Sequence, residues 1–119
     1  EGPHQIRKNM TPGTLLPFRA GMIVSNEPGI YVAGQFGVRL ENLLLALPAE
    51  ETPFGRFFRF ETLTLCPFDL RPVYLDQLSA AEVAWLNDYH AMVCDRLLPL
   101  LDDEIEKRWL IEATRMIEA

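Results

Sequence analysis

The chain has 119 residues, of which 49% are hydrophobic and 24% are charged, and its formal net charge is -6. This length and composition suffice for one packed domain or for part of one. The acidic balance and the scattered Lys and Arg residues argue against a nucleic-acid surface. The longest apolar run, residues 43–48, is far shorter than the roughly 20 residues of a membrane-spanning helix.

The first segment, EGPHQIRKN, does not begin with methionine and lacks the pattern of a secretory signal. We therefore expect the chain to be a piece of a longer protein. His4 lies in this segment, and we interpret it as a loop histidine and not as a ligand.

Up to about residue 78, Gly and Pro residues separate runs that favour β-structure. These runs are GMIVSNE (21–27), GVRLENLLLAL (37–47) and FRFETLTLC (58–66). They predict an antiparallel meander of three to five strands. The strand predicted around the third run, RFFRFETLTL (56–65), carries apolar residues on both faces, as in a sheet that is covered on both sides. Two late helices would not supply that cover, so we expect partner elements outside this chain.

From about residue 78 the pattern becomes helical. Ser79 and Glu82 have the spacing of a capping box, which predicts a helix start. Apolar residues then recur at helical spacing at Val83, Leu86, Val93, Leu97 and Leu100, with a break expected at Pro99. Acidic residues 102–104 favour the start of a second helix. Its expected buried stripe is Ile105, Trp109, Ala113 and Met116. The prediction is an α+β fold.

Some reactive and aromatic side chains have simple structural interpretations. His90 lies on the first predicted helix, where we expect it to pack or face solvent and not to bind a ligand. Trp85, Tyr89 and Trp109 are interpreted as helix anchors. Cys66 and Cys94 lack CxxC spacing, so we expect reduced, buried thiols and a cytosolic setting.

Two glutamates stand out in the stretch IVSNEPGIYVAGQFGVRLENLLL (23–45). A hairpin centred on Gly34 would place Glu27 opposite Glu41, because the two residues are equidistant from it. Opposed residues have Cβ atoms roughly 4.5–5.5 Å apart, and carboxylates that close share a proton or bind a cation. Carboxylate oxygens suit Mn²⁺, with Zn²⁺ or Co²⁺ as alternatives. Arg39 lies on the same face and would orient a carboxylate or a substrate group.

The alternative is an exposed edge hairpin in which Glu41 pairs with Arg39 or Arg7. A slip of one residue would also send the two carboxylates to opposite faces. The apolar neighbours argue against a solvent-facing strand and favour the metal hypothesis; they are Leu40, Leu43, Leu44 and Leu45.

The segments EGPHQI (1–6), AGMIVSNEPGIY (20–31) and FGVRLENLLL (36–45) closely resemble the catalytic domain of Xaa-Pro aminopeptidases (aminopeptidase P). These are M24 metallopeptidases with the pita-bread fold, and the resemblance concerns the C-terminal half of that domain. Residues 58–90 are similar to the C-terminal extension of three-domain members. The resemblance implies a C-terminal part of the peptidase domain over residues 1–66 and a helical extension over residues 67–119.

The resemblance also implies roles for individual residues. Glu27 would be a metal ligand and proton shuttle, Glu41 would bridge two metal ions, and Arg39 would support the site from behind the ligands. The two ions, usually manganese, would activate water to cleave the bond between an N-terminal residue and proline. The family's other ligands, two Asp and one His, and its substrate-contacting His precede the position of Glu1. We therefore expect this chain alone to bind metal weakly and to lack peptidase activity.

The extension favours an aminopeptidase over the sister enzymes prolidase and creatinase. The resemblance implies a homodimer that acts on peptides with proline in second position, and the cysteines indicate a cytoplasmic location. Two other classes stay open. One is a non-catalytic pita-bread protein that binds other proteins, although the presence of both Glu27 and Glu41 argues against decayed ligands. The other is a small α+β interaction domain that dimerises through its sheet and helices. A metal-free dimer with a buried sheet edge or helix face would indicate the latter.

Overall fold

The computed structural model describes residues 17–118, which form two compact units. The first unit ends at Thr64 and the second begins at Leu65. The resemblance implies a boundary between residues 66 and 67 that separates two regions of the family's sequence. The division into compact units does not test that boundary. It therefore stays a prediction.

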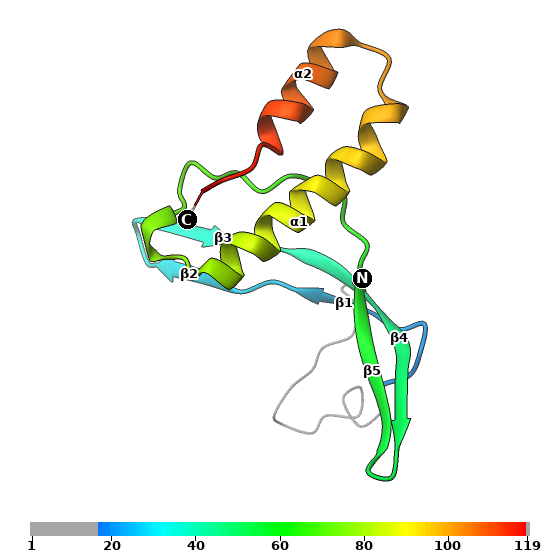
Figure 1. The fold of residues 1–119 in the computed structure, drawn as a ribbon. Coiled ribbons are helices and arrows are strands. Elements are labelled where there is room, and N and C mark those ends of the chain that lie inside the picture. The colour runs from blue at the N-terminus through cyan, green and yellow to red at the C-terminus, as the bar shows by residue number, and fades with distance from the viewer. Residues whose placement is uncertain (1–16, 119) are drawn as a thin grey trace. The chain divides into compact units, whose positions relative to one another are not determined.

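The first unit contains five strands, which agrees with the predicted meander of three to five (Figure 1). They are β1 (Ile23–Asn26), β2 (Gly29–Val32), β3 (Phe36–Arg39), β4 (Asn42–Thr52) and β5 (Gly55–Thr62). All pairings are antiparallel, and they make a three-stranded sheet of order β1-β4-β5 and a two-stranded sheet of β2 and β3.

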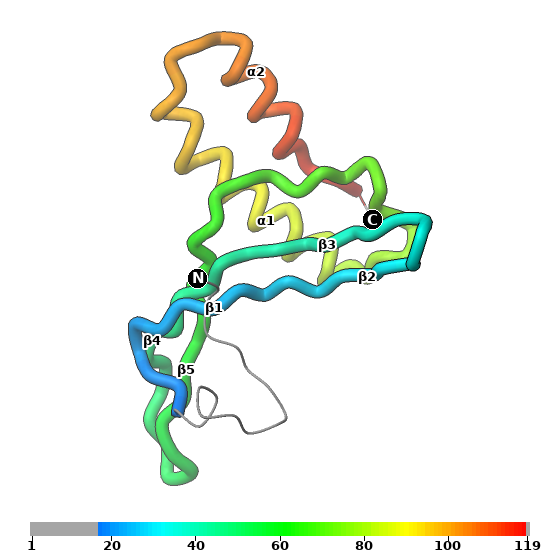
Figure 2. Tube along the Cα trace, turned by 180° about the vertical axis from the view of Figure 1, so that it is seen from behind, coloured from blue at the N-terminus to red at the C-terminus, as the bar shows by residue number. Residues whose placement is uncertain are grey.

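A long two-part hairpin joins the two sheets. In β2 and β3, Gly29 lies opposite Arg39, and in β1 and β4, Asn26 lies opposite Asn42. Both ladders keep the same register, so β1 continues into β2 beside β3 and β4 (Figure 2). At the turn, Gly34 has a φ of 72°, a left-handed conformation that glycine adopts without steric cost. The predicted hairpin centred on Gly34 is therefore confirmed.

The predicted strand over 37–47 was wrong in one respect, because it is interrupted between β3 and β4 at Leu40 and Glu41. The opposite chain is interrupted at Glu27 and Pro28. Proline has no N–H to donate to a ladder, which limits pairing at this point. Leu40 still donates its N–H to the Pro28 carbonyl at 3.1 Å, and this bond carries the register across the gap.

The β4–β5 pair contains a bulge between Pro48 and Glu51. Pro48 lies opposite Phe58 just before the extra residue of β4. Bulges release a strand from strict pairing and increase its local twist. The predicted strand over residues 56–65 starts within one residue of β5 but extends too far, since β5 begins at Gly55 and ends at Thr62.

The second unit holds two α-helices, α1 (Ala80–Leu97) and α2 (Glu104–Ala113), with short 3₁₀ turns η2 (Leu75–Gln77) and η3 (Leu98–Leu100). The predicted capping box is present: the Ser79 hydroxyl accepts from the Glu82 N–H at 3.3 Å, and the Ser79 N–H donates to the Glu82 carboxylate at 2.8 Å. Asp103 caps α2 by accepting from two backbone N–H groups. No helix among residues 17–118 is both long and apolar enough to cross a membrane.

The predicted buried stripe of α2 was wrong. Ile105, Trp109 and Met116 are exposed, with Trp109 at 61%, and Ala113 is only half-buried. The buried side chain is Leu110, which packs with Tyr89 and Val93 of α1. A ten-residue helix has several apolar positions, and the contact with α1 selects the face of Leu110.

On α1 the expected residues Val83, Leu86 and Val93 are buried. Leu97 is half-buried, and Leu100 is exposed because it lies past the helix in η3. Tyr89 is a confirmed anchor, whereas Trp85 and Trp109 are exposed. Trp85 nevertheless stacks on Tyr89, with ring centroids 5.8 Å apart and an interplanar angle of 5°.

Both cysteines are free thiols. Cys94 on α1 is half-buried, but the expectation of burial was wrong for Cys66, which is exposed. Cys66 lies in the irregular segment between β5 and η2, and its carbonyl accepts a hydrogen bond from the Tyr89 hydroxyl at 2.9 Å. The backbone is thus held at this point while the thiol faces outward.

His90 is a packing residue, as expected, and is only 1% exposed. Its Nε2 accepts the Phe68 backbone N–H at 3.0 Å, so this nitrogen carries no proton. Its Nδ1 is buried without a partner among the described residues. Burial lowers the pKa of His90 below its usual 6.5, because a charged ring is poorly solvated there.

We predict that His90 makes the second unit less stable in mild acid. The pKa of His90 is lower in the folded chain than in the unfolded chain, so below about pH 6.5 the unfolded chain binds a proton more readily. The free energy of unfolding is therefore highest above about pH 6.5 and decreases as the pH falls below that value. Urea unfolding at about pH 7.5 and 5.5 measures the loss. The His90→Gln variant should lose this pH dependence, whereas His4→Gln should keep it. Equal pH dependence in wild type and His90→Gln would contradict the prediction.

Candidate metal centre

The hairpin register places Glu27 opposite Glu41. Each glutamate lies in the link between two strands, and the paired residues on both sides of these links share one register. Successive side chains alternate between the faces of a strand, so Glu27, Arg39 and Glu41 belong to the same face. The structure therefore brings together the three predicted site residues.

Arg39 lies between the two carboxylates. Its Nη1 is 3.6 Å from Glu27 Oε2, and its Nε is 3.5 Å from Glu41 Oε2. The Ser25 hydroxyl also donates to Glu27 Oε1 at 2.5 Å. One guanidinium can offset the repulsion between two nearby carboxylates, because it offers separate N–H donors to each.

The glutamates are not buried in this chain: the side chains of Glu27 and Glu41 are 44% and 45% exposed. The expectation that apolar neighbours exclude solvent was wrong here, since Leu40 and Leu43 are exposed too. No other segment of residues 17–118 packs over these side chains closely enough to bury them. Ion pairs at such exposed positions contribute at most about 1 kcal/mol each.

The Glu41–Arg39 pair of the alternative hypothesis is present as well. This pair does not exclude a metal role. Arg39 contacts both Glu27 and Glu41, and two carboxylates that bind a metal ion must also lie close together. Arg7 and His4 lie outside the described residues.

Tyr31 lies on the same face as the candidate site, which the sequence analysis did not predict. Its ring lies across Gly29 and Gly37, so that a Cβ atom added at Gly29 would be 2.6 Å from the Tyr31 hydroxyl oxygen. At Gly37 an added Cβ would be 2.8 Å from Tyr31 Cδ1. Gly29 pairs with Arg39, so the Tyr31 ring extends over the same face as Arg39. The sequence contains a signal for this packing. Gly29 lies two residues before Tyr31 on the same strand, and Gly37 lies opposite Tyr31 in the hairpin register, so neither neighbour has a side chain that would displace the ring.

The chemistry of these donors fits a divalent metal ion, but their number is small. Two opposed carboxylates provide the oxygen ligands that Mn²⁺ favours. Among residues 17–118 no group of three or more His, Cys, Asp or Glu side chains converges as a metal site. His90 uses its Nε2 to accept the Phe68 N–H, and its Nδ1 is buried, so it is not among the candidate ligands. Glu27 and Glu41 therefore fit one part of a metal site.

Comparison with known proteins identifies the family of this chain. The family described as "Metallopeptidase family M24" matches residues 1–47, which include both glutamates. The family described as "C-terminal region of peptidase_M24" matches residues 56–117, more than half of the chain. This chain belongs to the M24 metallopeptidases.

Individual M24 relatives match nearly the whole chain. Aminopeptidase P2 of Arabidopsis thaliana is 44% identical over 97% of this chain, and the match covers 16% of the relative. Aminopeptidase P1 of Lotus japonicus is 39% identical over 98% of this chain and 18% of the relative. This M24 chain thus spans less than a fifth of the length of these curated relatives.

One solved structure has the same fold over the matched part. It is an X-prolyl aminopeptidase from Caenorhabditis elegans, described as a cytosolic enzyme with a di-nuclear active site. It is 31% identical, with a TM-score of 0.71, and the match covers 84% of this chain and 17% of that chain. The α+β prediction, with the antiparallel strands of a pita-bread domain followed by two helices, is confirmed for this M24 chain.

We predict that Gly29→Ala displaces the Tyr31 ring from the site. The added methyl group would overlap the hydroxyl, and the exposed ring can rotate away, so the free energy of unfolding should change by less than about 1 kcal/mol. NMR contacts between the Tyr31 ring and Gly37 should disappear.

The matched control is Gly34→Ala, whose added Cβ meets no atom within 4 Å but sits at a φ of 72°. It should lower the free energy of unfolding by about 1–2 kcal/mol through backbone strain and leave the Tyr31 contacts in place. Retained Tyr31–Gly37 contacts in Gly29→Ala would contradict the close packing.

Proposed function

We propose that this chain contributes two carboxylate ligands to the dinuclear metal site of a Xaa-Pro aminopeptidase. The convergence of Glu27 and Glu41 on Arg39, held by one continuous register, is the observation that carries the proposal. Relatives named aminopeptidase P, and a neighbour described as having a di-nuclear active site, support it.

Each residue has a proposed role. Glu27 would be a ligand that also moves the proton of the attacking water, since a carboxylate at that position can accept and release it. Glu41 would bridge two ions, because its two oxygens can bind separately. Arg39 would hold both carboxylates in position, as groups behind metal ligands do. The Ser25 hydroxyl occupies one Glu27 oxygen and leaves the other facing Arg39.

Two divalent ions, which we propose to be Mn²⁺ with Zn²⁺ or Co²⁺ as alternatives, would lower the pKa of water and stabilise charge on the scissile carbonyl oxygen. The substrates would be peptides with proline in second position. The protein would be a cytoplasmic homodimer, in line with the description of the nematode relative as cytosolic. The donors missing from the described residues, two Asp and one His in this proposal, would have to come from elsewhere.

We predict weak Mn²⁺ binding by the 119-residue chain that depends on both glutamates. Calorimetric titration should show that Glu27→Gln and Glu41→Gln each weaken binding by more than about tenfold, since changes to groups behind metal ligands alone typically weaken it 10–100-fold. The matched control is Glu50→Gln, at an exposed position beside the β4 bulge. Mn²⁺ affinity that is unchanged in Glu41→Gln would refute the ligand role.

We also predict that the 119-residue chain does not cleave Xaa-Pro peptides, with or without added Mn²⁺. Two carboxylates leave an ion mostly hydrated, so neither its position nor its Lewis acidity is well controlled. A coupled assay for free N-terminal amino acid tests this. Proline-specific cleavage that a chelator abolishes would show that the chain holds a sufficient site.

A further inference from the structure

A groove of about 510 Å³ lies in the second unit. It is bordered by two segments: residues 67–75, which precede α1, and the end of α2 with the residues that follow it. Residues 114–118 run close to the first of these segments in both views of the chain (Figures 1 and 2). Binding sites for small molecules typically measure roughly 300–1,000 Å³. The groove is therefore large enough for a ligand of that size.

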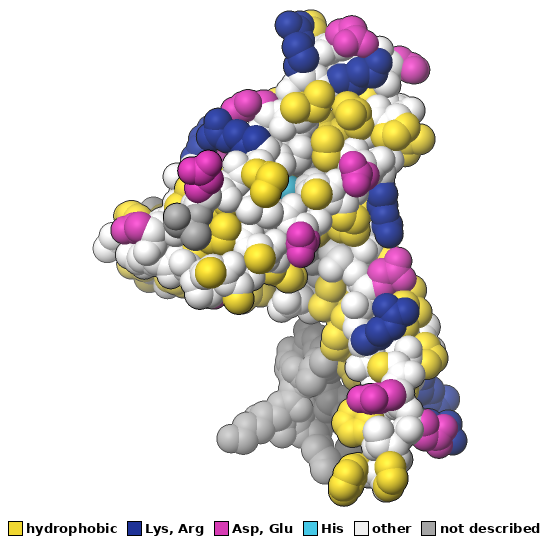
Figure 3. Space-filling view, viewed as in Figure 1, with side chains coloured by type: hydrophobic (Ala, Val, Ile, Leu, Met, Phe, Trp, Pro, Cys, Tyr) yellow, Lys and Arg dark blue, Asp and Glu magenta, His cyan; other side chains and the backbone are white. Residues whose placement is uncertain are grey.

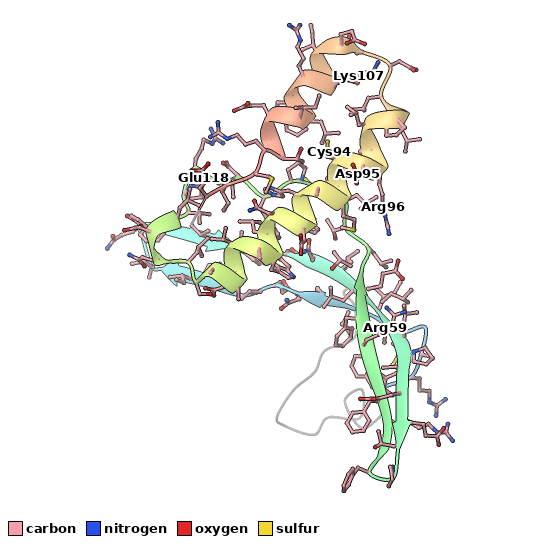
Figure 4. All side chains as sticks on the ribbon, in the orientation of Figure 1. Arg59, Cys94, Asp95, Arg96, Lys107 and Glu118 are labelled. Atoms are coloured by element: carbon pink, nitrogen blue, oxygen red, sulfur yellow. The ribbon has the colours of Figure 1, made fainter. Side chains whose placement is uncertain are left out.

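Hydrogen bonds to α1 hold both segments in place. The Asn87 side chain donates to the Ile117 carbonyl and accepts the Ile117 N–H, each at 2.9 Å. Glu118, labelled in Figure 4, follows directly. On the other segment, His90 accepts the Phe68 N–H at 3.0 Å. Because both segments are attached to one helix, the groove is already formed, and a ligand that binds there need not order it.

Apolar side chains form much of the lining, and Trp109 is the most accessible of them. Its indole is 61% exposed and offers a flat apolar face together with one N–H donor. Other apolar residues of the lining are buried or half-buried; they include Phe68, Leu70, Leu75, Ala113 and Ile117. A ligand in the groove would therefore meet the Trp109 ring and a more deeply placed apolar surface.

Two ion pairs supply the charges of the lining, one from each segment. Arg71 donates from Nε to Asp69 Oδ1 at 2.9 Å, and Arg115 donates from Nη1 to Glu112 Oε1 at 2.7 Å. Figure 3 shows basic and acidic side chains next to each other over the second unit. Hydrogen bonds from Arg71 lower the pKa of Asp69 to about 2, so this carboxylate is ionised at neutral pH. The charges of the lining therefore balance.

This balance argues against an anionic ligand, because an anion near either arginine would also meet a carboxylate. The arginines still have N–H donors to offer: Arg71 Nη1 and Arg115 Nε make no hydrogen bond to residues 17–118. The carboxylates, in contrast, already accept hydrogen bonds from the arginines. A complementary ligand is uncharged and apolar, and it presents hydrogen-bond acceptors but few donors.

Proline-rich peptides have this chemistry. Proline has no backbone N–H, and the carbonyl groups of a polyproline II helix make no internal hydrogen bonds. Grooves lined by aromatic residues recognise such peptides, because the polyproline II helix is formed before binding and loses little entropy.

We propose that the groove binds a proline-rich peptide segment in the polyproline II conformation. A pyrrolidine ring lies against Trp109, and backbone carbonyls of the peptide accept hydrogen bonds from Arg71 and Arg115. This inference goes beyond the proposed metal site, since the groove lies wholly in the second unit and uses neither Glu27 nor Glu41. The peptide is bound there and is not cleaved.

Tryptophan fluorescence tests the binding. The chain has two tryptophans, so a Trp85→Phe background leaves Trp109 as the reporter. The probe is a peptide of six prolines that is acetylated at its N-terminus and amidated at its C-terminus, used with a chelator present. The blocked amine prevents its recognition as an aminopeptidase substrate. The emission of Trp109 should shift in a saturable manner. A blocked peptide of alternating Gly and Gln, of the same length, should cause no shift, and inorganic phosphate should not displace the proline peptide.

Variants in the groove test its position by calorimetry. Trp109→Ala removes the exposed ring, and Ala113→Leu fills part of the groove, so each should weaken binding of the proline peptide about tenfold or more. The matched control Ala91→Leu adds the same atoms at an exposed position of α1 and should keep the affinity. Circular dichroism verifies that each variant stays folded.

Four results would overturn the proposal: no saturable binding of the proline peptide, an equal response to the Gly and Gln peptide, displacement by phosphate, or unchanged affinity in Trp109→Ala and Ala113→Leu. Displacement by phosphate would assign the groove to anions. None of these measurements involves a metal ion, so this proposal and the metal ligand roles of Glu27 and Glu41 fail separately.

Discussion

The register of the long hairpin is the constraint on which the first unit depends. It runs unchanged from β1 and β4 through the interruption to β2 and β3. Because side chains alternate between faces, a slip of one residue between the two arms of the hairpin would separate Glu27 from both Arg39 and Glu41. The Leu40 to Pro28 hydrogen bond and the left-handed turn at Gly34 maintain that register where strand pairing is interrupted.

The interruption itself has a structural use. At Glu27 and Glu41 the chain leaves the regular ladder, so these side chains are less confined by cross-strand neighbours than residues inside a strand. Arg39 remains within β3, where the strand fixes its backbone, and reaches both carboxylates. A cation between two carboxylates is an arrangement that a hard metal ion can join through the remaining oxygen lone pairs.

In the second unit, polar groups on α1 hold the segments around it. Asn87 exchanges two hydrogen bonds of 2.9 Å with the backbone of Ile117, and His90 accepts the N–H of Phe68. A helix interior rarely uses such residues unless they satisfy backbone groups that have no helical or strand partner. The aromatic group around Phe68 and Tyr89, with ring centroids 5.1 Å apart, fills the space between these bonds.

The sequence by itself determined the elements whose signals are local. These elements are the capping box at Ser79, the start of α2 and the hairpin about Gly34, each of which depends on residues close together in the sequence. The hairpin in turn places Glu27 opposite Glu41. Only the tertiary structure decided which face of α2 is buried, since Leu110 and Trp109 are both apolar and contact with α1 selects between them. It also revealed Tyr31 over its two glycines and the solvent exposure of the site. Burial is a property of the surroundings, which a local pattern does not contain.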